Sequence, residues 1–120
     1  MKSSPSNTTP LEHVEHVSFL NWFDKEFPDV FIHAIPNGVH LSHSQRRKAL
    51  LEGLRKGPSD LHVPAWHLYI EMKRQKGSVW GKDQKLYKEE VEKSGGTYLL
   101  CKGCANAINQ INDFHKARNK

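Results

Sequence analysis

One short strand constrains the fold of this chain more than any other segment. Residues 67–73 read His-Leu-Tyr-Ile-Glu-Met-Lys. Because side chains alternate between the two faces of a strand, one face carries Tyr69, Glu71 and Lys73 while the other is wholly apolar. The apolar residues are Leu68, Ile70 and Met72. An apolar face of this kind has to be buried, so we expect a sheet that packs on a core.

A second strand, residues 59–63, precedes this one and predicts a hairpin. The four residues 64–67 between the two strands form a short loop, which favours an antiparallel connection. In that register apolar residues oppose apolar residues, in the pairs Val63–Leu68 and Leu61–Ile70. The same register sets Asp60 opposite Glu71.

The two opposed carboxylates predict a site that holds positive charge. Directly opposed residues on a sheet have Cβ atoms about 5 Å apart, and like charges at that separation repel each other. Either the Lys73 ammonium or a divalent cation could lie between them, and hard oxygen ligands suit Mg²⁺. A carboxylate pair with one lysine is a compact site for phosphoryl transfer. The alternative is a solvated hairpin face with an ordinary Glu71–Lys73 pair.

Apolar periodicity and turn residues predict the other elements. The first helix, for example, repeats Phe19, Phe23 and Phe27 at helical spacing. The predicted helices span about residues 11–27, 42–56 and 82–93, with a last one ending near 117; the strands span about 30–35, 59–63, 67–73 and 97–101. The chain therefore reads as an α/β fold in the order α β α β β α β α. We expect a single domain over residues 11–120.

Glutamates near the start of the first helix are further candidates for metal binding. On a helical wheel Glu12 falls in line with Phe19 and Phe23, and Glu15 lies on the flank of that row. A buried carboxylate needs a partner, so Glu12, or with less support Glu15, is a candidate metal ligand. The alternative is a favourable interaction with the helix dipole in a frayed first turn. In the third helix Gln84 lies on the inward row, where a phosphate or a metal-bound water could contact it.

The second predicted helix is the most basic element. Ser42 or Ser44 caps it, and we expect Leu50 and Leu54 to face inward. The whole chain has 18 Lys and Arg against 13 Asp and Glu, a formal charge of +5, which favours nucleic acid as the partner. The residues expected to contact DNA phosphates flank the motif strands: Arg46, Arg47, Lys48, Arg55, Lys56, Arg74 and Lys76.

Composition also argues against several other classes of protein. Residues 1–10 contain two Pro, three Ser and two Thr without apolar periodicity, so we expect a flexible leader. No stretch approaches the roughly 20 apolar residues of a membrane span, and no signal peptide is recognisable. Cys101 and Cys104 are too few for a zinc site, so we expect reduced thiols in the cytoplasm, which for a viral protein is that of the host.

The motif residues resemble the VRR-NUC family, which belongs to the PD-(D/E)xK, restriction-endonuclease-like nucleases. The similar strings are Gly57-Pro58-Ser59-Asp60-Leu61, Tyr69-Ile70-Glu71-Met72-Lys73-Arg74, Gly77, and Gln84 with Tyr87. The resemblance runs from Leu11 to the last helix and implies a mixed central sheet flanked by helices. Two positions differ: Ser59 stands where the family usually has Pro, and His16 where it usually has Gln.

The resemblance implies hydrolysis of DNA phosphodiester bonds that depends on Mg²⁺ or Mn²⁺. By position, Asp60 and Glu71 match the metal ligands and Lys73 the residue that positions the attacking water. Gln84 matches the motif glutamine, and Glu12 the first-helix glutamate. Short, single-domain members of viral type are implied to be homodimers that act on four-way (Holliday) junctions. The rival interpretation is a basic DNA-binding module without catalysis.

Overall fold

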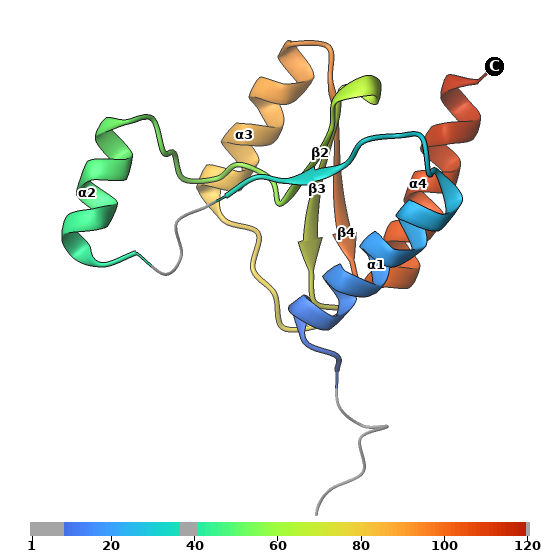
Figure 1. Ribbon diagram of the computed structural model, residues 1–120, viewed down its shortest axis with the longest axis horizontal. Helices are drawn as coiled ribbons and strands as arrows, with labels where there is room; N and C mark the ends of the chain where they lie inside the picture. Colours follow the sequence, from blue (N-terminus) through green and yellow to red (C-terminus); the bar gives the residue numbers. More distant parts are fainter. Residues whose placement is uncertain (1–8, 37–40, 120) are drawn as a thin grey trace, which may run out of the picture. The chain divides into compact units, whose positions relative to one another are not determined.

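The predicted order of elements is confirmed. The computed structural model describes residues 9–36 and 41–119. Within these residues the elements are α1 (Glu12–Glu26), β1 (His33–Ala34), α2 (His43–Leu51), β2 (Leu61–Val63), the 3₁₀ turn η2 (Pro64–Trp66), β3 (Leu68–Lys73), α3 (Lys82–Lys93), β4 (Thr97–Lys102) and α4 (Cys104–Arg118) (Figure 1). None of the described helices has the length and apolar character needed to cross a bilayer.

The described strands form one mixed sheet in the order β1-β2-β3-β4. β1 pairs with β2, and β2 with β3, in antiparallel fashion. The backbone N–H of Thr97 donates to the carbonyl of His67 at 3.0 Å, and that of Gly103 to Lys73 at 2.9 Å. The first bond joins the start of β4 to the start of β3, and the second joins the end of β4 to the end of β3. The two strands therefore run parallel. A parallel pair needs a crossover connection, which α3 provides.

The hairpin register is as predicted, with Val63 opposite Leu68 and Leu61 opposite Ile70. The loop between them turns tightly because Pro64 begins a 3₁₀ turn and His67 adopts a left-handed conformation with φ of 50°. The apolar face of β3 is fully buried, as its alternation predicts.

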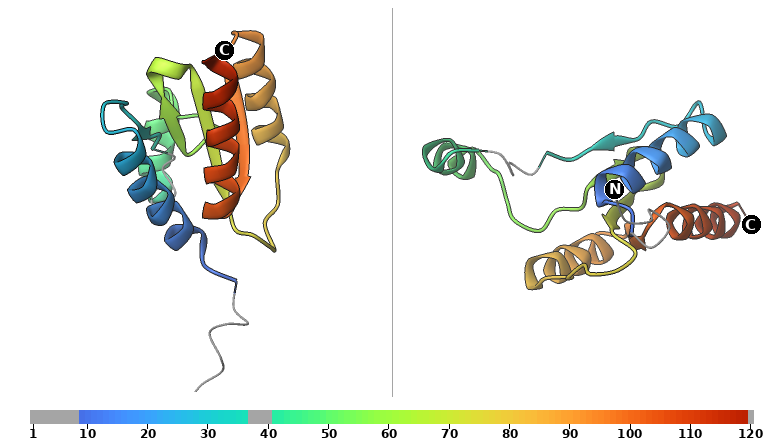
Figure 2. Two further views of the ribbon diagram at one scale, coloured as in Figure 1. Left: turned by 90° about the vertical axis from the view of Figure 1, so that its right-hand side faces the viewer. Right: turned by 90° about the horizontal axis from the view of Figure 1, so that it is seen from below.

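The chain divides into two compact units, and β3 and β4 contribute residues to both. The first unit comprises residues 1–31, 71–79 and 99–120. In it α1 packs against α4 (Figure 2). The Phe27 ring meets the His115 ring edge to face, with the ring centroids 4.9 Å apart. Its buried core contains Phe19, Phe23, Met72, Cys101, Ala107 and Ile111.

The second unit comprises residues 32–70 and 80–98. Its buried apolar residues come from the hairpin, α3 and the start of β4: Leu61, Val63, Trp66, Leu68, Ile70, Val91 and Tyr98. A row of rings extends from this core, with Tyr87 between Tyr69 and Tyr98 at centroid distances of 6.0 and 6.3 Å.

Three predicted elements are shorter than expected, and one of them is the strand predicted over residues 59–63, which spans only Leu61–Val63. The strand predicted over residues 30–35 is reduced to the two residues of β1, with Ile35 adding one hydrogen bond from its N–H to the Asp60 carbonyl at 2.8 Å. Pro36 follows, and it has no N–H with which to extend the ladder.

The expectation that α2 reaches residue 56 with two inward-facing leucines is wrong. Ser42 caps this helix through a reciprocal pair of hydrogen bonds with Gln45, but none of its residues is buried. Leu50 remains 39% exposed. The helix ends at Leu51 because Gly53 adopts a positive φ of 113°, which breaks the helical conformation.

Candidate active site

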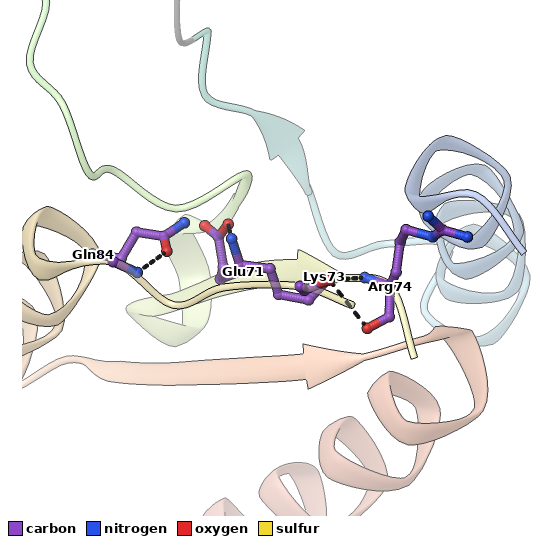
Figure 3. Close-up of polar contacts among 6 residues, drawn as sticks. Glu71, Lys73, Arg74 and Gln84 are labelled. Atoms are coloured by element: carbon purple, nitrogen blue, oxygen red, sulfur yellow. Dashed lines mark hydrogen bonds and ion pairs between the residues drawn. The ribbon is translucent and has the colours of Figure 1, made fainter. Parts of the chain in front are cut away.

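Glu71 and Lys73 form a largely buried ion pair on strand β3, within the first unit. The Glu71 residue is only 4% exposed. Lys73 Nζ lies 3.4 Å from Glu71 Oε2 (Figure 3). Burial removes a carboxylate from the water that would hydrate its charge, and a neighbouring cation then stabilises that charge. The predicted placement of these two residues on one face of the strand is therefore confirmed, and Lys73 supplies positive charge beside Glu71.

Asp60 belongs to the second unit and immediately precedes β2. Its side chain is half-buried, and its backbone carbonyl accepts the Ile35 N–H. The neighbouring Ser59 is 1% exposed and donates its hydroxyl to the Leu61 carbonyl at 3.3 Å. In the hairpin register Asp60 is the residue before Leu61, and Glu71 is the residue after its partner Ile70.

Gln84 occupies the first turn of α3, in the second unit, and is half-buried, as the inward row predicts. Its Oε1 accepts the backbone N–H of Gly81 at 2.9 Å (Figure 3). This bond satisfies one of the donors that the start of a helix leaves without an intrahelical partner. Gln84 therefore caps α3, a role that its spacing alone did not indicate.

The burial of the two glutamates of the first helix is the reverse of what the sequence predicts. Glu12 is exposed, whereas Glu15 is buried with 7% of its surface accessible. The buried row of α1 is Glu15, Phe19 and Phe23, spaced four residues apart. Glu12 precedes this row by nearly a full turn, in the helix's first turn, so the prediction that it faces the core is wrong.

Glu15 links α1 to the start of α4 and to the segment after β3, all within the first unit. Its Oε1 accepts the backbone N–H of Cys104 at 3.0 Å, and its Oε2 accepts the Gln75 side-chain amide at 2.9 Å. The adjacent Gly103 N–H donates to the carbonyl of Lys73. A carboxylate at a helix N-terminus is stabilised by the unsatisfied N–H groups there. Glu15 therefore has a structural role close to the backbone of Lys73.

Gly103 is a residue of this junction that sequence reasoning missed. Its φ is 92°, and an added Cβ would lie 2.7 Å from both Gln75 Cγ and Glu15 Oε2. Both the conformation and the close packing require glycine. Its position between a predicted strand and a predicted helix was the available signal.

The basic residues proposed for DNA binding differ in what their side chains contact. Arg47, Lys48, Arg55, Lys56 and Lys76 are exposed, and Arg46 is half-exposed. The Arg55 guanidinium donates to the Leu54 carbonyl at 2.9 Å.

Arg74 is anchored to the chain itself, in the first unit. Its Nη2 donates to the Thr9 carbonyl at 2.9 Å and its Nε to the Pro10 carbonyl at 3.3 Å. Its backbone N–H also donates to Ser78 Oγ at 3.0 Å (Figure 3). This guanidinium therefore holds the chain just before α1.

The histidines and cysteines of the described residues are candidate metal ligands and titrating groups. No group of three or more His, Cys, Asp or Glu residues that could hold a metal ion occurs among residues 9–36 and 41–119. Burial raises the pKa of the Cys101 thiol to about 12, so it stays protonated. Burial lowers the pKa of His62, and the positive charges of His33 and His67 lower it further.

Comparison with known proteins identifies the fold. No family model matches the sequence, and no curated protein matches it. A solved structure described as a VRR_NUC domain protein aligns with 91% of this chain and 91% of its own length, with 24% sequence identity and a TM-score of 0.74. The chain therefore has the fold of a VRR_NUC domain protein, as the resemblance of its motif residues predicts.

Proposed function

We propose that this chain is a metal-dependent endonuclease that hydrolyses DNA phosphodiester bonds. The observation that carries the proposal is the buried Glu71–Lys73 pair at 3.4 Å on strand β3, in a chain with the VRR_NUC fold. A buried charged pair costs desolvation energy and is weak evidence for stability. A pair of this kind in a fold shared with a nuclease-type domain is better explained by chemistry.

Asp60 and Glu71 are the proposed metal ligands. They adjoin the two residues of one rung of the β2–β3 ladder, Leu61 and Ile70. Mg²⁺ binds oxygen and is usually held by one or two carboxylates together with waters and substrate phosphates. Asp60 and Glu71 both supply carboxylate oxygen, which is the kind of donor that Mg²⁺ takes. Glu12, exposed in the first turn of α1, is the proposed third carboxylate.

Lys73 is the proposed residue that positions the attacking water. Its ammonium can donate hydrogen bonds to the water oxygen and to the phosphate, and Glu71 fixes where that ammonium lies. When bound, Mg²⁺ would offset phosphate charge and lower the pKa of a bound water. The side-chain amide of Gln84 would donate to a phosphate oxygen while its Oε1 caps α3.

The proposed substrate is branched DNA, and the proposed assembly is a homodimer. The exposed cations around α2 and after β3 are suited to phosphate contacts, which track the backbone without reading sequence. A dimer with two-fold symmetry would hold two active sites at a fixed separation, as symmetric cleavage of a four-way junction requires.

The test is cleavage of a panel of linear, flapped and four-way DNAs with Mg²⁺, comparing wild type with Glu71→Gln and Asp60→Asn. We expect cleavage to be lost in both variants while DNA binding is kept. Glu89→Gln, an exposed acid on α3, is the matched control and should cleave as wild type does. Sedimentation velocity tests the dimer.

The rival, a DNA-binding module without catalysis, predicts junction binding without cleavage by any of the four proteins. Equal cleavage by wild type and Glu71→Gln would instead refute the assignment of the site.

A further inference from the structure

Two histidines of the second unit lie next to each other, and neither has a role in the proposed hydrolysis. His33 and His62 are direct partners across β1 and β2. His33 Nε2 lies 3.2 Å from His62 Nδ1, and the two rings are nearly perpendicular, at 76°. Two imidazole nitrogens therefore lie within hydrogen-bond distance of each other on neighbouring strands.

The hydrogen bonds of His33 determine which nitrogen can accept. Its Nδ1 lies 3.0 Å from the Ala34 carbonyl. A carbonyl oxygen only accepts, so this Nδ1 carries the proton, and in the neutral ring the Nε2 lone pair faces His62. Histidine ligands of metals usually donate their other ring N–H to a carbonyl or carboxylate in this way.

The His62 ring is also held in place. It stacks on the Tyr69 ring with centroids 4.3 Å apart and planes 15° from parallel. A ligand that is already ordered loses little conformational freedom on binding.

The separation of the two nitrogens suits a shared metal. Two nitrogen ligands of a tetrahedral Zn²⁺ at about 2.05 Å lie about 3.3 Å from each other. The observed 3.2 Å is within about 0.1 Å of that value. A metal bound to both nitrogens could therefore replace the hydrogen bond between the rings once the His62 proton moves from Nδ1 to Nε2.

We propose that His33 and His62 form a two-imidazole site for a late first-row divalent metal, of which Zn²⁺ is the representative. This site is separate from the proposed Mg²⁺ site because imidazole nitrogen is a poor ligand for Mg²⁺ and a good one for Zn²⁺, Ni²⁺ and Cu²⁺. The remaining coordination positions are taken by water. The bound metal cross-links the two-residue strand β1 to β2 at the edge of the sheet.

Isothermal titration with Zn²⁺ in a non-chelating buffer tests the site. We expect one Zn²⁺ per chain, and binding at least about tenfold weaker in His33→Gln and in His62→Gln. His13→Gln, an exposed histidine of α1, is the matched control and should bind as wild type does. The thermal midpoint of wild type should rise with Zn²⁺, and those of the two variants should not.

A second measurement needs no variant. The electron paramagnetic resonance spectrum of wild type with one equivalent of Cu²⁺ should show coupling to two imidazole nitrogens. Unchanged Zn²⁺ affinity in both variants, a spectrum with fewer than two coupled nitrogens, or loss of Zn²⁺ binding in Cys104→Ser would each overturn the proposal. None of these readouts depends on nuclease activity.

Discussion

Replacing Glu15 by alanine should lower the free energy of unfolding by about 2–4 kcal/mol. The substitution removes a buried carboxylate that accepts hydrogen bonds from the Cys104 N–H and the Gln75 amide at 3.0 and 2.9 Å. A hydrogen bond to a charged group contributes about 1.5–3 kcal/mol, and water that enters the vacated space recovers part of the loss. The start of α4 also loses the negative charge next to its N–H groups.

Urea unfolding followed by far-UV circular dichroism measures this loss. With a slope of about 2 kcal/mol per molar urea, the midpoint of Glu15→Ala should fall by about 1–2 M at an unchanged slope. Glu12→Ala is the matched control, because Glu12 is exposed on the same helix three residues away. Its effect should stay within about 0.5 kcal/mol.

The two substitutions remove the same chemical group from the same helix, so their difference compares a buried carboxylate with an exposed one. If both variants unfold within about 0.5 kcal/mol of wild type, Glu15 does not anchor α4 and the reasoning fails.

Three further outcomes are expected. Gly103→Ala should destabilise the protein by about 2 kcal/mol or more in urea unfolding, since its φ of 92° strains any other residue; Gly81→Ala, with φ of −80° and open space at the Cβ, should not. Lys73→Met should reduce cleavage about a hundredfold or more in single-turnover assays, whereas Lys88→Met, at a half-exposed lysine of α3, should not. The lowered pKa of His62 means that the folded state binds fewer protons than the unfolded chain, so the free energy of unfolding should fall as pH drops below about 6.5. His62→Gln should flatten that part of the pH profile.

Local sequence was enough for the order of elements and for the central hairpin. Alternation along β3 predicts which of its faces is buried, because a strand presents successive side chains to opposite sides whatever surrounds it. The register then follows from loop length and from matching apolar residues, and Leu61 opposite Ile70 confirms it. The residues of the candidate site that lie on or beside this hairpin, Asp60, Glu71 and Lys73, were identified from the same pattern.

Helix faces were less well determined. A wheel shows which residues share a row, but the row that is buried depends on where the neighbouring helix lies. In α1 the buried row begins at Glu15, whereas Glu12, which a wheel sets in line with Phe19 and Phe23, lies at the helix's first residue and is exposed. In α2 the leucines of a basic sequence stay exposed, because nothing within the described part of the chain buries them.

The chain's sequence alone determined the order of its elements, its hairpin register and the carboxylate and lysine of β3, since each depends on residues close together along the chain. Tertiary structure decided the partners of Glu15, the need for glycine at 103, the anchoring of Arg74 by Thr9 and Pro10, and the meeting of His33 with His62. The physical reason is that these contacts join residues from about 30 to about 90 positions apart, and only the packed chain brings such residues within hydrogen-bond distance.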